Sequence, residues 1–340
     1  MEPSLLICPN CGAPLAPHAI KTVVVCKHCG ASVARGIHAV KSSRFRDARL
    51  AIEHEISENE NDVTVSGRRY RVIGRIARGE STDVFLAKEA RRAGSMALIK
   101  ILRVESDADL LARERAALDA LLRSAAPSTA YFSLLAPQIL GSGILSWRGD
   151  AIGECTVVRA SSGFVDTIAD IRAAYPDGVD PRHAVWIYKR MLEMLAWVHE
   201  AGWVHGAILP QHIVVHVRGH GARIVGFSCA NRISEKLVAF NESQKEFYPD
   251  AILNGSRLTP AIDLVMAARV IAFLLGGNAS YDFSASVPAP IADLVRSNAL
   301  ADVSAFRAST REVLDHVSRA AHEAFGPPRF VELTMPRSIS

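Results

Sequence analysis

Hydrophobic and polar positions follow two different periods along this chain. From about residue 68, apolar residues alternate with polar ones in YRVIGRIARGESTDVFLAKEA, on either side of ARGEST, and again in SMALIKIL. Shorter apolar runs lie at 134–144 and 154–158. A period of two residues predicts strands. After SSG at 161–163 the period becomes that of helices, so the pattern predicts a β-rich part followed by a mainly helical part.

Helix signals are clearest in two segments. DADLLARERAALDALL has a stripe of leucines and contains Glu114, which predicts an amphipathic helix. PRHAVWIYKRMLEMLAWVHEAG follows Asp180 as a cap, begins at Pro181 and is closed by Gly202. Beyond it, the apolar runs 213–217 and 223–225 flank RGHG and predict a β-hairpin.

The most apolar segment is TPAIDLVMAARVIAFLLGG. Its stretch from Ile262 to Gly277 is interrupted by Asp263 and Arg269 and is shorter than the ~20 residues that span a bilayer. It therefore predicts a buried helix, and no membrane partner is expected. The start of the chain, MEPSLLICPNC, lacks a basic region and a long apolar core, so no secretory signal is expected.

Two CxxCG knuckles stand near the N-terminus. CPNCGAPL and CKHCGASV give the pattern C-x2-C-x14-C-x2-C, formed by Cys8, Cys11, Cys26 and Cys29. Four thiolates at this spacing can surround one Zn²⁺, and IKTVVVC between them predicts a strand. Because protein sulfur fills all four positions, the expected zinc is structural. The pattern leaves open whether the ribbon also recognises a partner.

Composition and boundaries complete the outline. The chain has 340 residues, of which 49% are hydrophobic and 22% charged, with a formal charge of +4. This is ordinary globular composition and requires neither a nucleic acid nor an anionic membrane. Because the cysteines suggest metal binding and not disulfides, a reducing, cytoplasmic location is expected. We assign a zinc ribbon to 1–35, a helical connector and linker to 36–66, the main domain to 67–330 and a tail to 331–340.

The order of motifs in the main domain resembles the protein kinases. GRIARGESTDVFLA is similar to the glycine-rich loop, ALIK to the strand with the phosphate-binding lysine, here Lys100, and Glu114 to its helical partner. HGAILPQH stands at the catalytic loop, GFS at D-F-G and YPDAIL at A-P-E, and Asp263 at the buried aspartate of the central helix. The resemblance covers about residues 68–326. It implies an α+β, two-lobed protein kinase-like fold, with a small β-rich N-lobe and a helical C-lobe, and is closest to bacterial zinc-ribbon kinase-like proteins.

Four positions depart from the chemistry that the resemblance implies. The catalytic aspartate is replaced by Ala207, the lysine of the catalytic loop by Leu209, the metal-binding asparagine by His212 and the D-F-G aspartate by Gly226. The base, the cation and both Mg²⁺ ligands are therefore missing together. Imidazole is a poor ligand for Mg²⁺, which prefers oxygen, so the sequence argues against a Mg²⁺ cofactor.

The sequence does not decide whether the chain binds a nucleotide. Lys100 and Glu114 are retained, and so is Val84, which the resemblance places above an adenine. However, ARGEST keeps only Gly79 of the usual glycines, and Leu98 stands where a small floor residue is usual. The same Lys100–Glu114 pair would equally fix a helix to a sheet without any ATP.

The structural residues of the family are kept where the chemical ones are not. His205, Phe227 and Leu118 match its internal stack, and Asp263 matches its anchor for the catalytic loop. We therefore expect a catalytically impaired, kinase-like regulatory or scaffold protein that binds a protein partner through its lobes and zinc ribbon. The alternative is an atypical ATP-dependent kinase or nucleotidyl transferase that uses Lys100 and Glu114. A nucleic-acid binder working through the ribbon is a third class, although basic pairs such as 68–69 lack alternating aromatic residues.

Overall fold

The computed structural model describes residues 62–79, 81–90 and 95–336, and the backbone of four short strands nearer the N-terminus. These strands pair as two antiparallel ladders: β1 (Leu6–Ile7) with β2 (Pro14–Leu15), and β3 (Val23–Val25) with β4 (Ser32–Ala34). The strand expected in IKTVVVC is thus confirmed as β3. The four expected zinc ligands, Cys8, Cys11, Cys26 and Cys29, lie outside the described residues, as does the connector up to residue 61.

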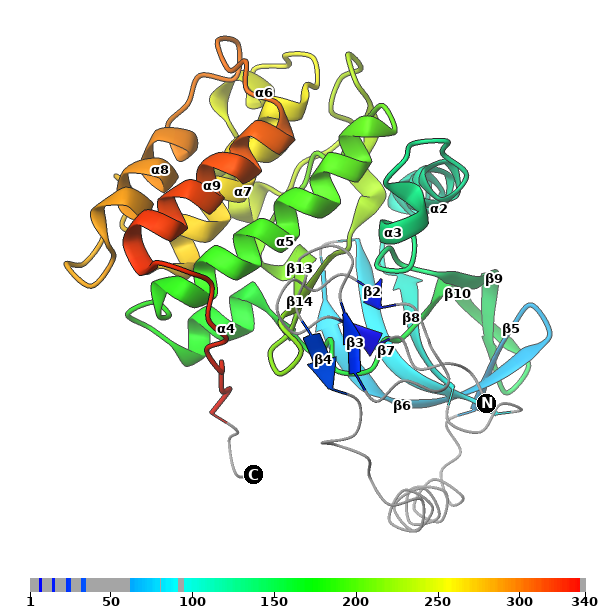
Figure 1. Ribbon diagram of the computed structural model, residues 1–340. Coiled ribbons are helices and arrows are strands. Elements are labelled where there is room, and N and C mark those ends of the chain that lie inside the picture. The colour runs from blue at the N-terminus through cyan, green and yellow to red at the C-terminus, as the bar shows by residue number, and fades with distance from the viewer. Residues whose placement is uncertain are drawn as a thin grey trace.

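A closed antiparallel barrel forms the first well-described part of the molecule (Figure 1). Its strands follow the order β10-β8-β7-β6-β5-β9 around the barrel. They are β5 (Asp62–Val65), β6 (Arg68–Arg78), β7 (Thr82–Glu89), β8 (Met96–Leu102), β9 (Ile139–Trp147) and β10 (Asp150–Arg159). Inward positions alternate with outward ones, so Ala87, Ala97 and Ile99 are fully buried inside.

This barrel corrects the expected fold class. The two-lobed protein kinase-like fold is wrong, because a closed barrel of six strands followed by helices does not fit it. Closure depends on β5, which pairs with β6 on one side and with β9 on the other. DVTV was assigned to the polar linker, yet Val63 and Val65 point inward and are buried. Two alternating valines next to charged residues are too weak a pattern to predict a strand from sequence.

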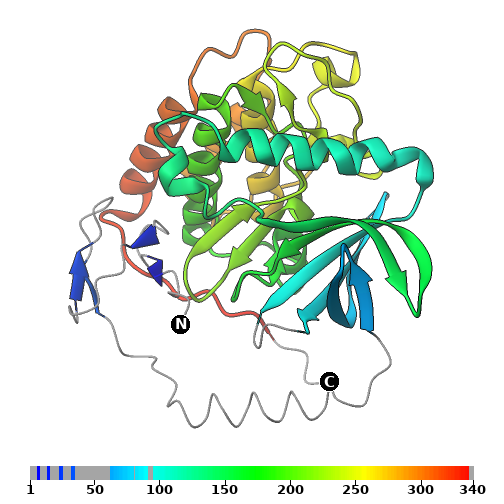
Figure 2. The same cartoon turned by 90° about the vertical axis from the view of Figure 1, so that its right-hand side faces the viewer.

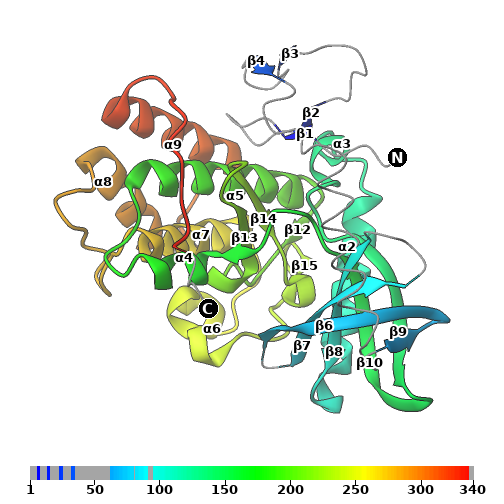
Figure 3. The ribbon, with the colours of Figure 1, turned by 90° about the horizontal axis from the view of Figure 1, so that it is seen from below.

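The helical part lies beside the barrel (Figures 1 and 3), and all of its helices, except those that come between β8 and β9, follow the barrel in the chain. The helices are α2 (Ala108–Leu122), α3 (Thr129–Phe132), α4 (Ile168–Ala174), α5 (Pro181–Glu200), α6 (Asp250–Leu253), α7 (Pro260–Leu274), α8 (Ala289–Ala299) and α9 (Thr310–Phe325). The 3₁₀ helices are η1 (Glu105–Asp107), η2 (Pro210–His212), η3 (Phe227–Cys229) and η4 (Glu242–Phe247). The small strands are β11 (Asp166–Thr167), β12 (Trp203–Val204), β13 (Ile213–His216), β14 (Gly221–Ile224) and β15 (Asn231–Arg232).

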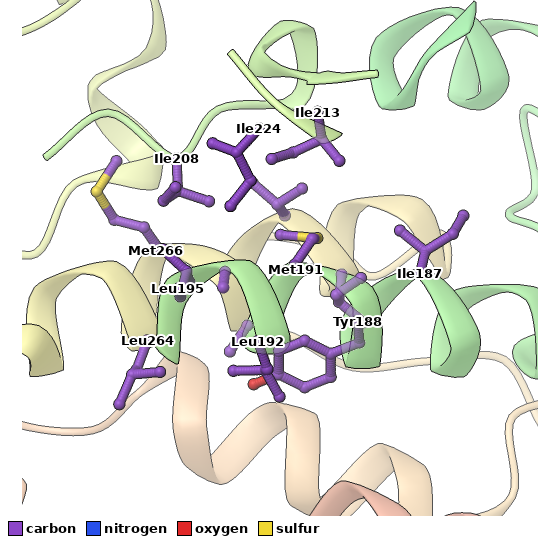
Figure 4. Close-up of a cluster of buried hydrophobic side chains, with 14 of the residues drawn as sticks. Ile187, Tyr188, Met191, Leu192, Leu195, Ile208, Ile213, Ile224, Leu264 and Met266 are labelled. Atoms are coloured by element: carbon purple, nitrogen blue, oxygen red, sulfur yellow. The ribbon is translucent and has the colours of Figure 1, made fainter. Parts of the chain in front are cut away.

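Helix α5 has the ends that its sequence predicts. The Asp180 carboxylate accepts a hydrogen bond from the Arg182 N–H at 2.9 Å, and Gly202 leaves the helix with a φ of +79°. Helix α5 packs against α7 and against strand β14 of the β13–β14 hairpin. Figure 4 shows Met191 and Leu195 of α5 next to Ile208, Ile224 and Met266, in one continuous apolar core.

Helix α2 stands between the two parts. Figure 2 shows it running alongside the barrel strands, with the helical part on its other side. It contacts β10 of the barrel and η3 of the helical part. Leu118 and Leu121, on its buried face, belong to the core of the helical part. Their burial therefore fixes α2 to the helices.

Two further predictions concern the apolar helix and the tail. Helix α7 is buried along nearly its whole length, as its sequence predicts. In the described part of the chain, no helix has the length and apolar character needed to cross a bilayer. Residues beyond α9 fold back on the domain, where Phe330 stacks on His220 at 4.3 Å between ring centres and Leu333 is buried.

Candidate functional site

The site centres on an ion pair between the barrel and α2. Strand β8 turns Ala97 and Ile99 into the barrel, so Lys100 points outward, toward α2. Its ammonium group donates to one oxygen of the Glu114 carboxylate. Glu114 is 4% exposed, and its other oxygen accepts a hydrogen bond of 3.2 Å from the Phe227 N–H. One carboxylate therefore joins the barrel to η3 of the helical part.

Two opposing effects set the pKa of Glu114. Burial raises it, but the charge of Lys100 and the hydrogen bonds from Lys100 and Phe227 outweigh burial, so the pKa is lowered overall. Glu114 is ionised at neutral pH, and both of its oxygens already have donors. A second clamp lies beside it, where Arg115 of α2 donates to Glu154 at 2.8 Å and to the Thr156 hydroxyl at 3.1 Å.

The loop that joins β12 to η2 is held from below by Asp263. This carboxylate, fully buried in α7, accepts the His205 N–H at 2.7 Å and the Gly206 N–H at 2.9 Å. It also accepts a hydrogen bond from His199 Nε2 at 2.9 Å. Because a carboxylate only accepts, His199 carries its proton on Nε2, and its Nδ1 accepts the Thr310 hydroxyl at 2.6 Å. Three donors thus fix one buried charge.

His205 completes this frame. Its Nε2 donates to the Val225 carbonyl at 3.1 Å, and its Nδ1 accepts the Ala207 N–H at 3.3 Å. The ring packs edge-on against Phe227, with 4.5 Å between ring centres. Burial lowers the pKa of His205 to about 4, so the imidazole is neutral. The residues predicted as structural, including Leu118, are all buried and lie together.

Two of the substituted positions, His212 and Gly226, pack against each other next to this frame. His212 Nδ1 donates to the Ala207 carbonyl at 2.8 Å, which turns the ring toward Gly226. Gly226 has a φ of +80°, and a Cβ atom built there would lie 2.8 Å from His212 Cδ2 and Nε2. Burial lowers the pKa of His212. The imidazole therefore fills the space that any side chain at position 226 needs.

Ala207 and Leu209 belong to the interior. Each is 1% exposed and lies in the core of the helical part. Neither position faces solvent, so a polar side chain there would need its own buried partners. The loop is a packed element, and at Ala207 and Leu209 it offers no side chain that could take a proton from a substrate hydroxyl group.

The turn that resembles a glycine-rich loop is a tight hairpin turn. The Gly79 N–H donates to the Thr82 carbonyl at 2.8 Å, and the Arg103 N–H donates to the Ser81 carbonyl at 2.9 Å. Arg103 also donates from its side chain to the Gly79 carbonyl. The Gly79 amide is thus already used within the turn. Val84 lies opposite Lys100 in the ladder, and so the structure brings Val84, Lys100 and Glu114 together but does not form an amide cradle around Gly79.

Two features of this region were not predicted from sequence. His199 is the third donor to Asp263, and it depends on how α5 packs against α7, which no local pattern reveals. Asp83 at the barrel rim lies next to Arg78 at 2.9 Å, Arg75 at 3.9 Å and Arg103 at 4.0 Å. Arginines at every third or fourth position of β6 hint at this cluster, but the pairing partner comes from another strand.

A scan against protein-family models finds none that matches. The expected zinc ligands Cys8, Cys11, Cys26 and Cys29 lie outside the described residues. Within the described ranges, no group of three His, Cys, Asp or Glu side chains is placed to hold a metal ion.

Proposed function

We propose that this chain is a non-catalytic regulatory or scaffold protein that binds a protein partner. The observation that carries the proposal is the contact between His212 and Gly226, which closes the place where metal-binding oxygens would be needed. The motif resemblance to protein kinases is local in this proposal and concerns the ion pair, the 205–212 loop and Phe227. A site can keep such local features on a different fold, because function depends on the site.

The remaining acidic groups support the same conclusion. Glu114 is held by Lys100 and the Phe227 amide, and Asp263 by three donors. A general base must reach the proton that it removes, and a metal ligand needs an oxygen with a free lone pair in the right place. Both buried carboxylates are fully engaged in holding the frame. Neutral imidazoles occupy the rest of the site.

ATP binding is a separate part of the proposal. Lys100, Glu114 and Val84 lie on one outward surface of β7, β8 and α2, which supports a weak contact with a phosphate group. The engaged Gly79 amide and the bulk of Leu98 act against it. We propose that any ATP binding is weak and independent of Mg²⁺, and that Lys100 and Glu114 serve first to hold α2 against the barrel.

The N-terminal segment adds a structural zinc in this proposal. Each CxxC pair falls in the segment that connects two paired short strands, as in a zinc ribbon. A reducing compartment such as the cytoplasm suits four metal-binding thiolates. The ribbon and the main domain would give two contact surfaces for one partner, so that two weak contacts act together.

Thermal shift with ATP tests the site, and a pull-down tests the partner. We expect ATP to raise the Tm little, and equally with and without Mg²⁺. Full-length protein and a variant lacking residues 1–35 should capture overlapping sets of proteins, with lower recovery for the variant. A large shift that appears only with Mg²⁺ would count against a closed metal site. Identical recovery would show that the ribbon is no partner surface.

The retained ion pair favours one alternative, an atypical kinase or nucleotidyl transferase that positions ATP with Lys100 and Glu114. Such an enzyme must recruit an acid from elsewhere, so its activity would require metal and disappear in Lys100→Met. A nucleic-acid binder working through the ribbon would instead show DNA or RNA binding that weakens steeply with salt.

A further inference from the structure

The barrel contains a cavity that is open to solvent and lies on the inner face of β8, opposite the side from which Lys100 projects. Its volume is about 390 Å³, and every strand of the barrel contributes an apolar side chain to its wall. One from each strand is Val63, Val72, Phe85, Ile101, Trp147 and Ile152. Below it, the interior is filled by Tyr70, Ala97, Cys155 and Val157, which are buried. The barrel is therefore packed in one half and hollow in the other.

The mouth of the cavity exposes apolar side chains and carries positive charge. Trp147 is 39% and Ile152 51% exposed. Arg75 pairs with Phe85 in the ladder, and directly paired residues point to the same face, so Arg75 reaches the rim on the cavity side. Arg78 and Asp83 pair in the same way and lie next to it.

The single negative charge of Asp83 does not neutralise all the arginines around it. Its carboxylate is bound by Arg78 through two hydrogen bonds of 2.9 Å and 3.1 Å, while Arg75 stays 3.9 Å away. The Arg75 side chain is 46% exposed. A further acid near this end, Asp62, is hydrogen-bonded to Arg71 at 2.8 Å. Arg75 thus places an exposed cationic group at the rim, where it can meet an anion from solvent.

We propose that the barrel mouth binds a free acyl carboxylate, with its aliphatic chain in the cavity and its carboxylate at Arg75. Ligand pockets are usually concave, mostly apolar and about 300–1,000 Å³ in volume, with a few polar groups that fix orientation. An apolar cavity of about 150 Å³ can hold benzene, so a cavity of about 390 Å³ suits a chain of roughly ten carbons once the open mouth is allowed for. This site is independent of the function proposed above.

Titration calorimetry with decanoate below its micelle concentration tests the proposal on the full chain. We expect saturable binding at one site per chain. Ile152→Trp fills the mouth and should weaken binding at least tenfold. Because Ile152 is half exposed, that variant should keep the native Tm, which is measured in parallel. Decanol should also bind and should also be excluded by Ile152→Trp.

Arg75→Gln isolates the contact with the head group. It should weaken decanoate binding about fivefold, the upper scale of one solvent-exposed ion pair, and leave decanol unchanged. Arg319→Gln on the exposed face of α9 is the matched control and should change neither ligand. The proposal is overturned if the full chain does not bind decanoate, if Ile152→Trp binds as the native chain does, or if Arg75→Gln affects both ligands equally. Binding of an apolar peptide in place of decanoate would overturn the acyl assignment.

Discussion

The helical part and the barrel differ in how their interiors are packed. The helical part has one continuous apolar core, within which the buried Asp263 and His205 are hydrogen-bonded. The barrel has a small core and a hollow end of about 390 Å³. The difference indicates that the helical part supplies the rigid frame of the site, whereas the barrel can adapt. The Lys100–Glu114 pair joins the two.

Asp263→Asn should have the largest effect, because it removes the charge on which three donors converge. An amide offers only one oxygen and places its own N–H groups against donors. We expect a loss of about 3–5 kcal/mol in the free energy of unfolding, measured by urea titration. Asp315→Asn, on the exposed face of α9, should cost less than about 0.5 kcal/mol. Equal costs would contradict the idea of a rigid frame.

Acid should weaken the helical part next. Burial lowers the pKa of His205 and of His220 to about 4, from an ordinary value of 6.5. The unfolded chain takes up these protons near pH 6.5 and the folded chain does not, so stability is complete above about pH 6.5 and falls toward pH 4. The expected slope is about 1.4 kcal/mol per pH unit for each histidine.

His205→Asn tests this slope. Between about pH 7 and pH 5, its urea unfolding free energy should depend on pH less than that of the native chain, whatever its absolute stability. The exposed His316→Gln should keep the native slope. If His205→Asn also keeps the native slope, then folding does not keep the His205 imidazole unprotonated.

Lys100→Met tests the join between the two parts. It leaves the Glu114 carboxylate buried with only the Phe227 amide, which should cost about 2–3 kcal/mol. This cost lies below the usual range of about 3–5 kcal/mol for a buried pair, because the Lys100 side chain is 19% exposed. Adding Glu114→Gln should recover most of the loss in a double-mutant cycle. The exposed pair of Lys245 and Glu242 is the control, and Lys245→Met should cost less than about 0.5 kcal/mol.

Gly226→Ala measures how tightly His212 closes the site. Gly226 and Gly255 both have a φ of +80°, but nothing lies within 4 Å of a Cβ at Gly255. Alanine at either position should cost about 1–2 kcal/mol of backbone strain. At Gly226, the His212 ring should add about 1–2 kcal/mol. In a His212→Ala background the two glycines should become equivalent, and a persistent difference would show that the ring does not fill this space.

The smallest effect concerns packing. Val72→Ile adds one methylene group to the barrel cavity and should stabilise the chain by up to about 0.8 kcal/mol. Val265→Ile adds the same group to the filled core around α7 and should destabilise it by about 1 kcal/mol. Calorimetric melting of both variants gives the sign. Two changes of the same sign would erase the contrast between the barrel and the helical part.

Sequence reasoning succeeded where structure depends on neighbours along the chain. Helix α5 has strong local end signals in Asp180, Pro181 and Gly202. Helix α7 is apolar apart from Asp263 and Arg269. Barrel closure was missed because it depends on pairing between Asp62–Val65 and residues about 80 positions away, which no local pattern encodes. Without that strand, the alternating segments resembled a kinase lobe.

The sequence predicted the residues of the site more completely than it predicted the fold. Lys100, Glu114, His205, Asp263 and Phe227 were recognised as a group and do lie together. Their motifs have fixed spacing, so each residue was found before its contacts were known. His199 and the packing of His212 on Gly226 were missed, because both arise from side chains that meet only after the helices and the β13–β14 hairpin have packed.

The central claim is that the site keeps a frame but no phosphate-transfer chemistry. It is tested most directly by incubating the full chain with Mg²⁺ and ATP labelled at either the α- or the γ-phosphate, alone and with a general acceptor protein, beside Lys100→Met. The account predicts no label on any protein above the level of the variant. Transfer of either label that requires Lys100 would contradict it.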